Sequence, residues 1–326
     1  MPALTYPEAI VVGLFQGVSE LFPVSSLGHS VLIPALIGGR WARDLNVSAP
    51  ESPYLAFIVG LHVATALALL AYFWRDWLRI AGGFATSLRD RQVRTADQRL
   101  AWLIILATIP VGIAGLLLEH TFRTVLGKPI PAAIFLTVNG VILYAGERLR
   151  RRDPAQTAPA GYARQMAAVP ASQPAPEQPP GRHAAPPDAA AADRDADRRL
   201  AGIGYPQAVL IGSAQIFALL PGISRSGVTM VAGLTRGLSH EDAARFAFLL
   251  ATPVILAAGA LKIPDLAGPL GSGIRGQILA GSLFSGIGAY LSVRFLLRYF
   301  QTRTLTPFAI YCTVAGLASL AYLTLT

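Results

Sequence analysis

Two matching stretches decide the fold of this chain. Residues 9–28 read AIVVGLFQGVSELFPVSSLG, and residues 208–227 read AVLIGSAQIFALLPGISRSG. The stretches align without a gap at a shift of 199 positions, with Ala9, Gly13, Gln16, Leu21, Ser25 and Gly28 falling on Ala208, Gly212, Gln215, Leu220, Ser224 and Gly227. An internal repeat of this kind indicates that one structural unit occurs twice.

Each stretch predicts a helical hairpin that enters a membrane without crossing it. In both, an apolar helix of about fifteen residues leads into a turn rich in Ser and Gly, and a second short apolar stretch follows. A spanning helix needs roughly 17 to 25 residues, so each arm is too short to cross comfortably. An irregular tip is tolerated at membrane depth only where protein buries it or it lines a watery cavity. We therefore predict re-entrant hairpins at residues 8–37 and 206–236.

The rest of the chain is apolar enough to span a bilayer several times. Hydrophobic residues make up 53% and charged residues only 14%, whereas soluble domains carry roughly 25% charged residues. Five segments, 54–73, 101–118, 131–146, 277–293 and 306–326, contain no Asp, Glu, Lys or Arg, and a sixth is interrupted only by Pro253. The predicted fold class is an all-α polytopic membrane protein, with spans at 54–73, 101–118, 131–147, 246–262, 277–299 and 306–325.

A polar segment separates the two halves. Residues 153–199 are rich in Ala and Pro and lack apolar periodicity, which predicts a disordered loop between a first repeat, 1–152, and a second, 200–326. Each repeat has one hairpin and three spans. Because three is an odd number, the second hairpin must enter from the opposite face, which makes an inverted-topology repeat.

The basic residues predict the orientation. Of the 27 Lys and Arg residues, 20 lie in loops 74–100, 147–205, 236–245 and 294–305, and positively charged loops face the cytoplasm. We therefore expect a multi-pass protein of the plasma (inner) membrane, with both termini and the active site facing the periplasm and the long loop in the cytoplasm. This distribution also accounts for the net charge of +9 without a nucleic-acid partner.

Six more Lys and Arg residues lie in the opposite loops, 38–53, 119–130 and 262–276, which leaves one basic residue and one acidic residue deep in the predicted membrane segments. Arg225 lies at the tip of the second hairpin, and Glu20 lies deep in the first arm. A charge at membrane depth costs roughly 2.5 to 3.5 kcal/mol on insertion scales, so both are functional candidates. The alternative interpretation is a buried ion pair that holds the hairpins together, and the two interpretations are compatible.

Polar residues surround both candidates. Gln16 and Glu20 share one helix face and either direct oxygen atoms toward a hard cation or are solvated in a cavity. Pro23-Val-Ser-Ser-Leu-Gly-His29 offers two hydroxyls and an imidazole. In the second tip, Ser224, Arg225 and Ser226 lie between Gly222 and Gly227, which is suited to an anion cradle.

The remaining polar residues are expected to have mainly structural roles. His62, within a predicted span, is expected to make an interhelical hydrogen bond or to form a wall of the cavity. Asn139 and Gln215 are expected to hydrogen-bond between helices. His240 is expected to be solvated in a loop, and the single cysteine, Cys312, to pack between helices.

Together these motifs resemble the undecaprenyl pyrophosphate phosphatase family of the bacterial bacitracin-resistance type. The resemblance covers essentially the whole chain, although Gln16 stands where many members have Glu and Leu27 where many have Thr. It implies hydrolysis of undecaprenyl diphosphate, a polyprenyl diphosphate lipid, to the monophosphate and phosphate, which recycles the lipid carrier of cell-wall synthesis. Gln16 weakens the expected metal site, because a neutral amide binds a cation less well and cannot act as a base.

The resemblance also implies roles for individual residues. The implied catalytic residues are Glu20, Ser26, His29 and Arg225, and the implied substrate-binding residues are Ser25, Gly222, Ser224, Ser226 and Gly227. A divalent cation, Mg²⁺ or Ca²⁺, is expected near Glu20 and Gln16. Ser26 is the expected nucleophile with His29 as acid and base, and attack by a water that His29 or Glu20 activates is the competing mechanism.

Two other functions remain open from the sequence. Inverted repeats with broken helices are common in transporters, so a phosphate or lipid-phosphate transporter or flippase is the main alternative. A lipid phosphatase of the phosphatidic-acid type would need a second histidine and an aspartate after the arginine, and His240 and Asp242 come too late. The expected partners are the lipid substrate and the bilayer, with a homodimer as a further possibility.

Overall fold

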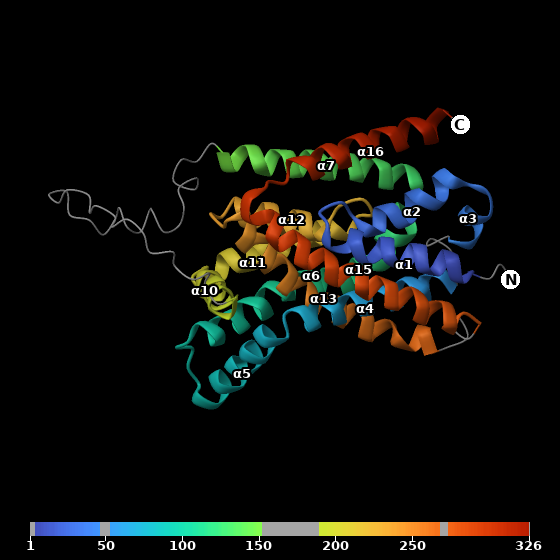
Figure 1. Ribbon diagram of the computed structural model, residues 1–326. Helices are drawn as coiled ribbons and strands as arrows, with labels where there is room; N and C mark the ends of the chain where they lie inside the picture. The colour runs from blue at the N-terminus through green and yellow to red at the C-terminus, as the bar shows by residue number, and fades with distance from the viewer. Residues whose placement is uncertain (1–3, 46–52, 152–188, 268–272, 326) are drawn as a thin grey trace, which may run out of the picture.

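The computed structural model describes residues 4–45, 53–151, 189–267 and 273–325, and all regular structure in these ranges is helical (Figure 1). The helices are α1 Tyr6–Leu21, α2 Ser26–Ile37, α3 Gly39–Asp44, α4 Pro53–Tyr72, α5 Trp74–Asp90, α6 Ala96–Leu126, α7 Pro129–Arg151, α10 Ala189–Ala201, α11 Tyr205–Ser213, the 3-10 helix η1 Ala214–Leu219, α12 Arg225–Leu234, α13 His240–Ala267, α15 Arg275–Thr302 and α16 Thr306–Leu325.

Within the described ranges, five helices are long and apolar enough to cross a membrane. These spans are Ala96–Leu118, Pro129–Arg151, His240–Leu261, Arg275–Thr302 and Thr306–Leu325. Two further pairs qualify only as bent units: Phe57–Tyr72 with Trp74–Asp90, bent by 84°, and Asp193–Ala201 with Tyr205–Leu219, bent by 101°. The range 54–73, which the sequence predicts as a span, coincides with α4 apart from one residue at each end.

The outer surface of these helices suits lipid rather than water. Leu116, Leu117, Leu279, Leu283 and Val314 each expose more than 60% of their area. Apolar surface of this extent on a soluble monomer would favour aggregation, whereas hydrocarbon accommodates it at no cost. The chain is therefore a polytopic helical membrane protein.

In each range where the sequence predicts a hairpin, the structure has two helical arms joined by a turn. The first consists of α1 and α2, and the second of α11, η1 and α12. They begin with the same cap: the Thr5 amide donates to Glu8 Oε2 at 2.8 Å, and the Gly204 amide donates to Gln207 Oε1 at 3.1 Å. In each case a side chain three residues into the helix satisfies an amide that the helix cannot.

The tips of the two hairpins pack directly on each other. A Cβ atom added at Gly28 would lie 2.8 Å from Gly222 Cα, and one added at Gly227 would lie 3.3 Å from Pro23 Cβ. Pro23 and Gly28 of the first tip occupy the same repeat positions as Gly222 and Gly227 of the second. The same two positions therefore meet twice, as they do across a two-fold axis.

Helices α7 and α16 cross in the same reciprocal way. A Cβ at Gly140 would overlap Thr313, and a Cβ at Gly316 would overlap Thr137. The two helices run in opposite directions in Figure 1, and the first and last described residues lie at the same end of the molecule. Small residues at such crossings let the backbones approach closely.

One prediction about the long loop is wrong. Residues 189–199 are helical and belong to α10, whereas 152–188 lie outside the described residues. The sequence of α10 shows no apolar periodicity, because ion pairs rather than apolar side chains attach this helix to the rest of the protein. Buried Arg245 on α13 lies 2.9 Å from Asp193 and 3.0 Å from Asp197, and Arg199 lies 2.8 Å from Asp242.

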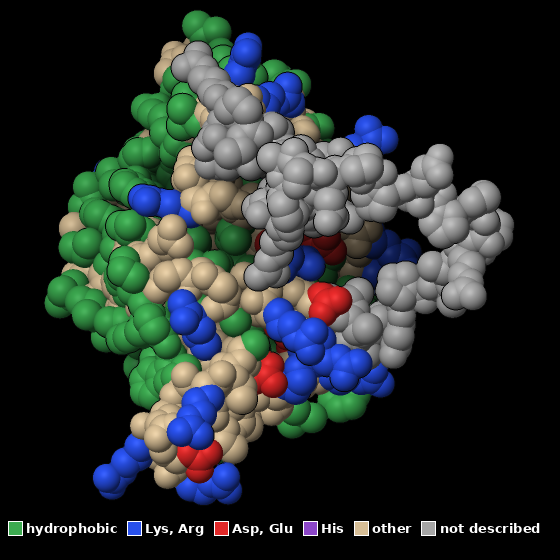
Figure 2. All heavy atoms as spheres, turned by 90° about the vertical axis from the view of Figure 1, so that its left-hand side faces the viewer, with side chains coloured by type: hydrophobic (Ala, Val, Ile, Leu, Met, Phe, Trp, Pro, Cys, Tyr) green, Lys and Arg blue, Asp and Glu red, His purple; other side chains and the backbone are tan. Residues whose placement is uncertain are grey.

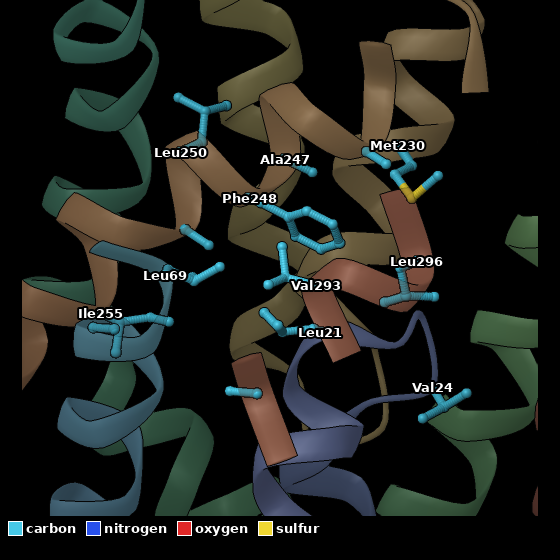
Figure 3. Close-up of a cluster of buried hydrophobic side chains, with 14 of the residues drawn as sticks. Leu21, Val24, Leu69, Met230, Ala247, Phe248, Leu250, Ile255, Val293 and Leu296 are labelled. Carbon is cyan, nitrogen blue, oxygen red and sulfur yellow. The ribbon is translucent and has the colours of Figure 1, made fainter. Parts of the chain in front are cut away.

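One part of the buried core lies where α12, α13 and α15 meet the end of α1. Figure 3 shows Leu21, Met230, Phe248, Val293 and Leu296 converging there, and each of these side chains is 1% exposed or less. Opposite the end where the termini lie, Lys and Arg side chains gather on the face that Figure 2 shows.

The close approach of the tips gives a testable prediction. Gly28→Ala is expected to destabilise the protein by about 1 to 3 kcal/mol, because its methyl group would press on the Gly222 backbone. The melting temperature of the purified protein would fall by several degrees. Gly115→Ala on α6 is the matched control, since nothing lies within 4 Å of its Cβ. Equal melting temperatures for the two variants would contradict close packing of the tips.

Candidate active site

Glu20, on α1, is the centre of the polar cluster at the tips. Its carboxylate accepts hydrogen bonds from the Ser26 hydroxyl on one oxygen and from the Arg225 guanidinium on the other. The residues that the sequence placed in different halves are thus in direct contact, which brings together a carboxylate, a hydroxyl and a guanidinium. Glu20 and Ser26 are buried, whereas Arg225 keeps 16% of its side chain exposed.

His62, on α4, is the histidine that faces this cluster. Its Nδ1 donates to the Ile58 carbonyl at 2.8 Å, because a carbonyl oxygen can only accept. Its Nε2 then lies 3.2 Å from Glu20 Oε2. One proton therefore lies between this nitrogen and the carboxylate oxygen. Since 29% of its side chain is exposed, His62 also forms part of the open wall of the cluster.

The backbone around the cluster is suited to bind an anion. Ser26 is the first residue of α2, and Arg225 is the first residue of α12, at the equivalent position of the repeat. Two helix N-termini therefore meet beside Glu20, and the first amides of each helix give that end a partial positive charge. Such ends are ready binding sites for phosphate groups.

The two turns hold unusual backbone conformations. Ser25 has φ of 69°, which is uncommon for a residue with a side chain, and Gly222 has φ of 116°, which favours glycine. Ser25 caps α2 by accepting a hydrogen bond from the Gly28 amide at 3.2 Å. Strain directly before Ser26 is of the kind that is retained where a precise side-chain position matters.

The hydroxyls of the second tip connect the two hairpins. Ser224 caps α12 through the Gly227 amide at 3.2 Å and lies 3.1 Å from the Ser226 hydroxyl. Both hydroxyls donate to the Phe22 carbonyl, at 3.4 Å and 3.3 Å. Ser224 and Ser226 therefore shape the cradle, and their predicted hydrogen bonds to substrate would have to replace these contacts.

A fully buried asparagine fixes the tips to each other. Asn139, on α7, donates to the Pro23 carbonyl at 3.1 Å and accepts from the Ser224 amide at 3.0 Å. The expectation that Asn139 bonds between helices is confirmed, and its partners prove to be the two tips themselves. Gln215 does not behave as expected: it is buried, and neither of its amide atoms has a hydrogen-bond partner among the described residues.

His29 is engaged away from Ser26. Its Nδ1 donates to the Ser25 carbonyl at 2.8 Å, and its Nε2 lies 2.8 Å from the Tyr311 hydroxyl of α16. With both nitrogens occupied, His29 holds the strained turn in place. The structure does not bring Ser26 and His29 together, since Ser26 donates to Glu20 instead.

The expected cation does not fit Glu20 and Gln16 as they are arranged. Gln16 Oε1 accepts from the hydroxyls of Thr65 at 3.2 Å and Ser285 at 2.6 Å, and its Nε2 faces Glu20 at 3.4 Å. The oxygen that would bind a cation is thus turned to α4 and α15. The negative charge of Glu20 already has two partners, Arg225 and His62.

His240 is buried, contrary to the expectation of a solvated loop residue. Its Nε2 lies 2.8 Å from Glu147 Oε2 and its Nδ1 lies 2.9 Å from Arg150 Nη1. Asp242 pairs with Arg199 on α10. Neither residue joins the Glu20 cluster, so the structure gives no support to a lipid phosphatase of the phosphatidic-acid type.

Comparisons with known proteins match one family over nearly the whole chain. The family model described as bacitracin resistance protein BacA matches residues 9–318. A protein of Mycolicibacterium paratuberculosis named undecaprenyl-diphosphatase is 66% identical over 99% of this chain and 98% of its own length. Undecaprenyl-diphosphatase 1 of Frankia casuarinae is 59% identical over 97% of each chain, and undecaprenyl-diphosphatase 2 of Burkholderia orbicola is 41% identical over 96% of this chain and 95% of its own.

Proposed function

The chain belongs to the bacitracin resistance protein BacA family, and we propose that it hydrolyses undecaprenyl diphosphate to undecaprenyl phosphate and inorganic phosphate. The activity recycles the lipid carrier of cell-wall synthesis and confers resistance to bacitracin. The enzyme is a membrane-embedded hydrolase whose substrate is a lipid.

One observation supports the assignment of this function to the Glu20 cluster. A single carboxylate, Glu20, holds both the Ser26 hydroxyl and the Arg225 guanidinium where two helix N-termini meet. A diphosphate needs positive charge on its oxygens and a nucleophile in line with the bond to be broken. Arg225 and the helix ends supply the charge, and Ser26 supplies the nucleophile.

The reaction proceeds in two displacements. Glu20 takes the Ser26 proton while Ser26 Oγ attacks the terminal phosphorus, and the bond to the bridging oxygen breaks to release undecaprenyl phosphate. Water then cleaves the phosphoserine, which releases inorganic phosphate and restores the hydroxyl. In the competing mechanism Glu20 activates water directly, and Ser26 only positions the headgroup.

His62 positions Glu20 in this scheme. His62→Ala removes a charge-assisted hydrogen bond and is expected to lower kcat by about 10- to 100-fold with little change in KM. His62→Gln keeps a donor toward Glu20 and should recover most of the loss. Steady-state kinetics of both variants check this, and a glutamine variant as impaired as the alanine variant would refute the positioning role.

The divalent cation stays a prediction from the sequence, and no step above depends on it. Phosphate release with and without EDTA tests it. Unchanged turnover with EDTA would show that Arg225, His62 and the helix ends neutralise the diphosphate by themselves.

The reciprocal contacts of the tips and of α7 with α16 support an inverted repeat. Because α7 and α16 are antiparallel, a two-fold axis relating them must be perpendicular to both and thus lie in the membrane plane. The basic face of Figure 2 supports a cytoplasmic position for α10, with both termini and the active site toward the periplasm of the plasma membrane. A cysteine at Arg194 should resist impermeant thiol reagents in intact cells, whereas one at Gly273 should react.

The function itself is tested by one assay. The purified chain in detergent should release one phosphate per undecaprenyl diphosphate and leave undecaprenyl phosphate. Absence of phosphate release, together with movement of lipid phosphate between leaflets of proteoliposomes, would favour the alternative of a transporter or flippase.

A further inference from the structure

A group of arginines at the end of α15 has no role in the reaction. Arg294, Arg298 and Arg303 are exposed, and none forms an ion pair or hydrogen bond through its side chain within the part of the chain that the structure describes. Many other arginines of the protein have partners, as Arg79, Arg199 and Arg245 do on the same side of the molecule. These three therefore carry charge that no acidic side chain of the described residues neutralises.

The three arginines line one hollow. It has a volume of about 460 Å³, and its other walls include Leu291, Phe295 and Thr302. Arg294 and Arg298 are four residues apart, so they lie on one face of α15 and repel each other. An arrangement that is unfavourable alone becomes favourable when an anion lies between the two guanidinium groups.

The position of the hollow matches the headgroup layer of a membrane. Helix α15 has 28 residues, roughly 42 Å at 1.5 Å per residue, which exceeds a hydrocarbon core of about 30 Å. Its stretch without charged residues, 277–293, ends directly before Arg294. The guanidinium groups thus follow the hydrocarbon boundary, where headgroup phosphates lie.

The walls of the hollow suit a lipid rather than a free ion. Leu291 and Phe295 expose 57% and 51% of their area on the same face as the arginines. Tyr299 lies beside them, with its ring centroid 5.7 Å from that of Phe295, as aromatic residues do at membrane interfaces. A phosphate headgroup can contact the arginines while its acyl chains contact Leu291 and Phe295.

We propose that the hollow formed by Arg294, Arg298 and Arg303 binds the headgroup of an anionic phospholipid of the surrounding leaflet. The site is separate from the Glu20 cluster and does not depend on the function proposed for that cluster. It anchors the last turns of α15 in the headgroup layer, where basic pockets recognise anionic lipids.

The experiment is native mass spectrometry of the purified protein titrated with phosphatidylglycerol or phosphatidylcholine. The wild type should bind one phosphatidylglycerol at least about tenfold more tightly than phosphatidylcholine. Arg294→Gln/Arg298→Gln/Arg303→Gln should lose this preference while keeping phosphate release in detergent. The matched control, Arg89→Gln/Arg91→Gln/Arg94→Gln at the end of α5, removes the same charge and should keep the preference.

Three results would overturn the proposal. One is equal affinity of the wild type for both lipids, and another is an undiminished preference in the triple variant, whose melting temperature verifies that it is folded. The third is displacement of the bound phosphatidylglycerol by equimolar undecaprenyl phosphate, because the hollow would then be a site for the reaction product. Retained phosphatidylglycerol under that challenge supports a phospholipid as the occupant.

Discussion

Ser26→Ala is expected to lower phosphate release from undecaprenyl diphosphate by at least about a thousandfold. Ser26 donates its hydroxyl proton to Glu20 and begins α2, so the oxygen is both activated and placed at the positive end of a helix. Without that oxygen the two-step route is closed. Single-turnover measurements with purified protein would also show that no phosphorylated protein accumulates.

Ser25→Ala is the matched control for this prediction. Ser25 caps α2 through the Gly28 amide, so its loss should cost about 1 kcal/mol of stability and less than tenfold in turnover. A Ser26→Ala variant that loses less than about tenfold would instead favour direct attack by water that Glu20 activates. Equal losses in the two variants would remove the assignment of Ser26 as nucleophile.

Arg225→Gln should lower kcat by about a thousandfold or more, as removal of a charge-stabilising arginine does in other phosphoryl transfers. Arg225 is the guanidinium that reaches Glu20 from the opposite hairpin, and it begins α12 as Ser26 begins α2. Arg225→Lys keeps the charge but loses the planar fork, and it should be intermediate.

Arg236→Gln is the control for Arg225, because Arg236 is exposed just beyond the end of the same short helix. It should leave kcat within about twofold of the wild type, as surface substitutions usually do. The measurement is steady-state phosphate release, with the melting temperature confirming that each variant is folded. An Arg225→Gln enzyme that retains more than a tenth of the wild-type kcat would contradict its role at the diphosphate.

The sequence predicted the contact that defines the site. The repeat at a shift of 199 positions revealed two hairpins, and the cost of burying charge singled out Glu20 and Arg225 as partners. This pairing could be predicted from the sequence because Glu20 and Arg225 are isolated charges in apolar segments. A charge in such a segment needs a partner or a function.

Other features were hidden because they depend on tertiary contacts. His62 looks like an ordinary polar residue in a span, and only the packing of α4 against α1 shows that it faces Glu20. The amide of Gln16 turns toward Ser285, which is 269 residues away in the sequence. Helix α10 is held by ion pairs with α5 and α13, so no apolar periodicity reveals it.

An experimental structure of the protein with a methylene-bridged diphosphonate analogue of undecaprenyl diphosphate tests the central claim most directly. We expect the terminal phosphonate between the first turns of α2 and α12, with Arg225 hydrogen-bonded to its oxygens and Ser26 Oγ about 3 to 3.5 Å from its phosphorus. A headgroup bound elsewhere, or Glu20 and Arg225 far apart with the analogue in place, would contradict the account.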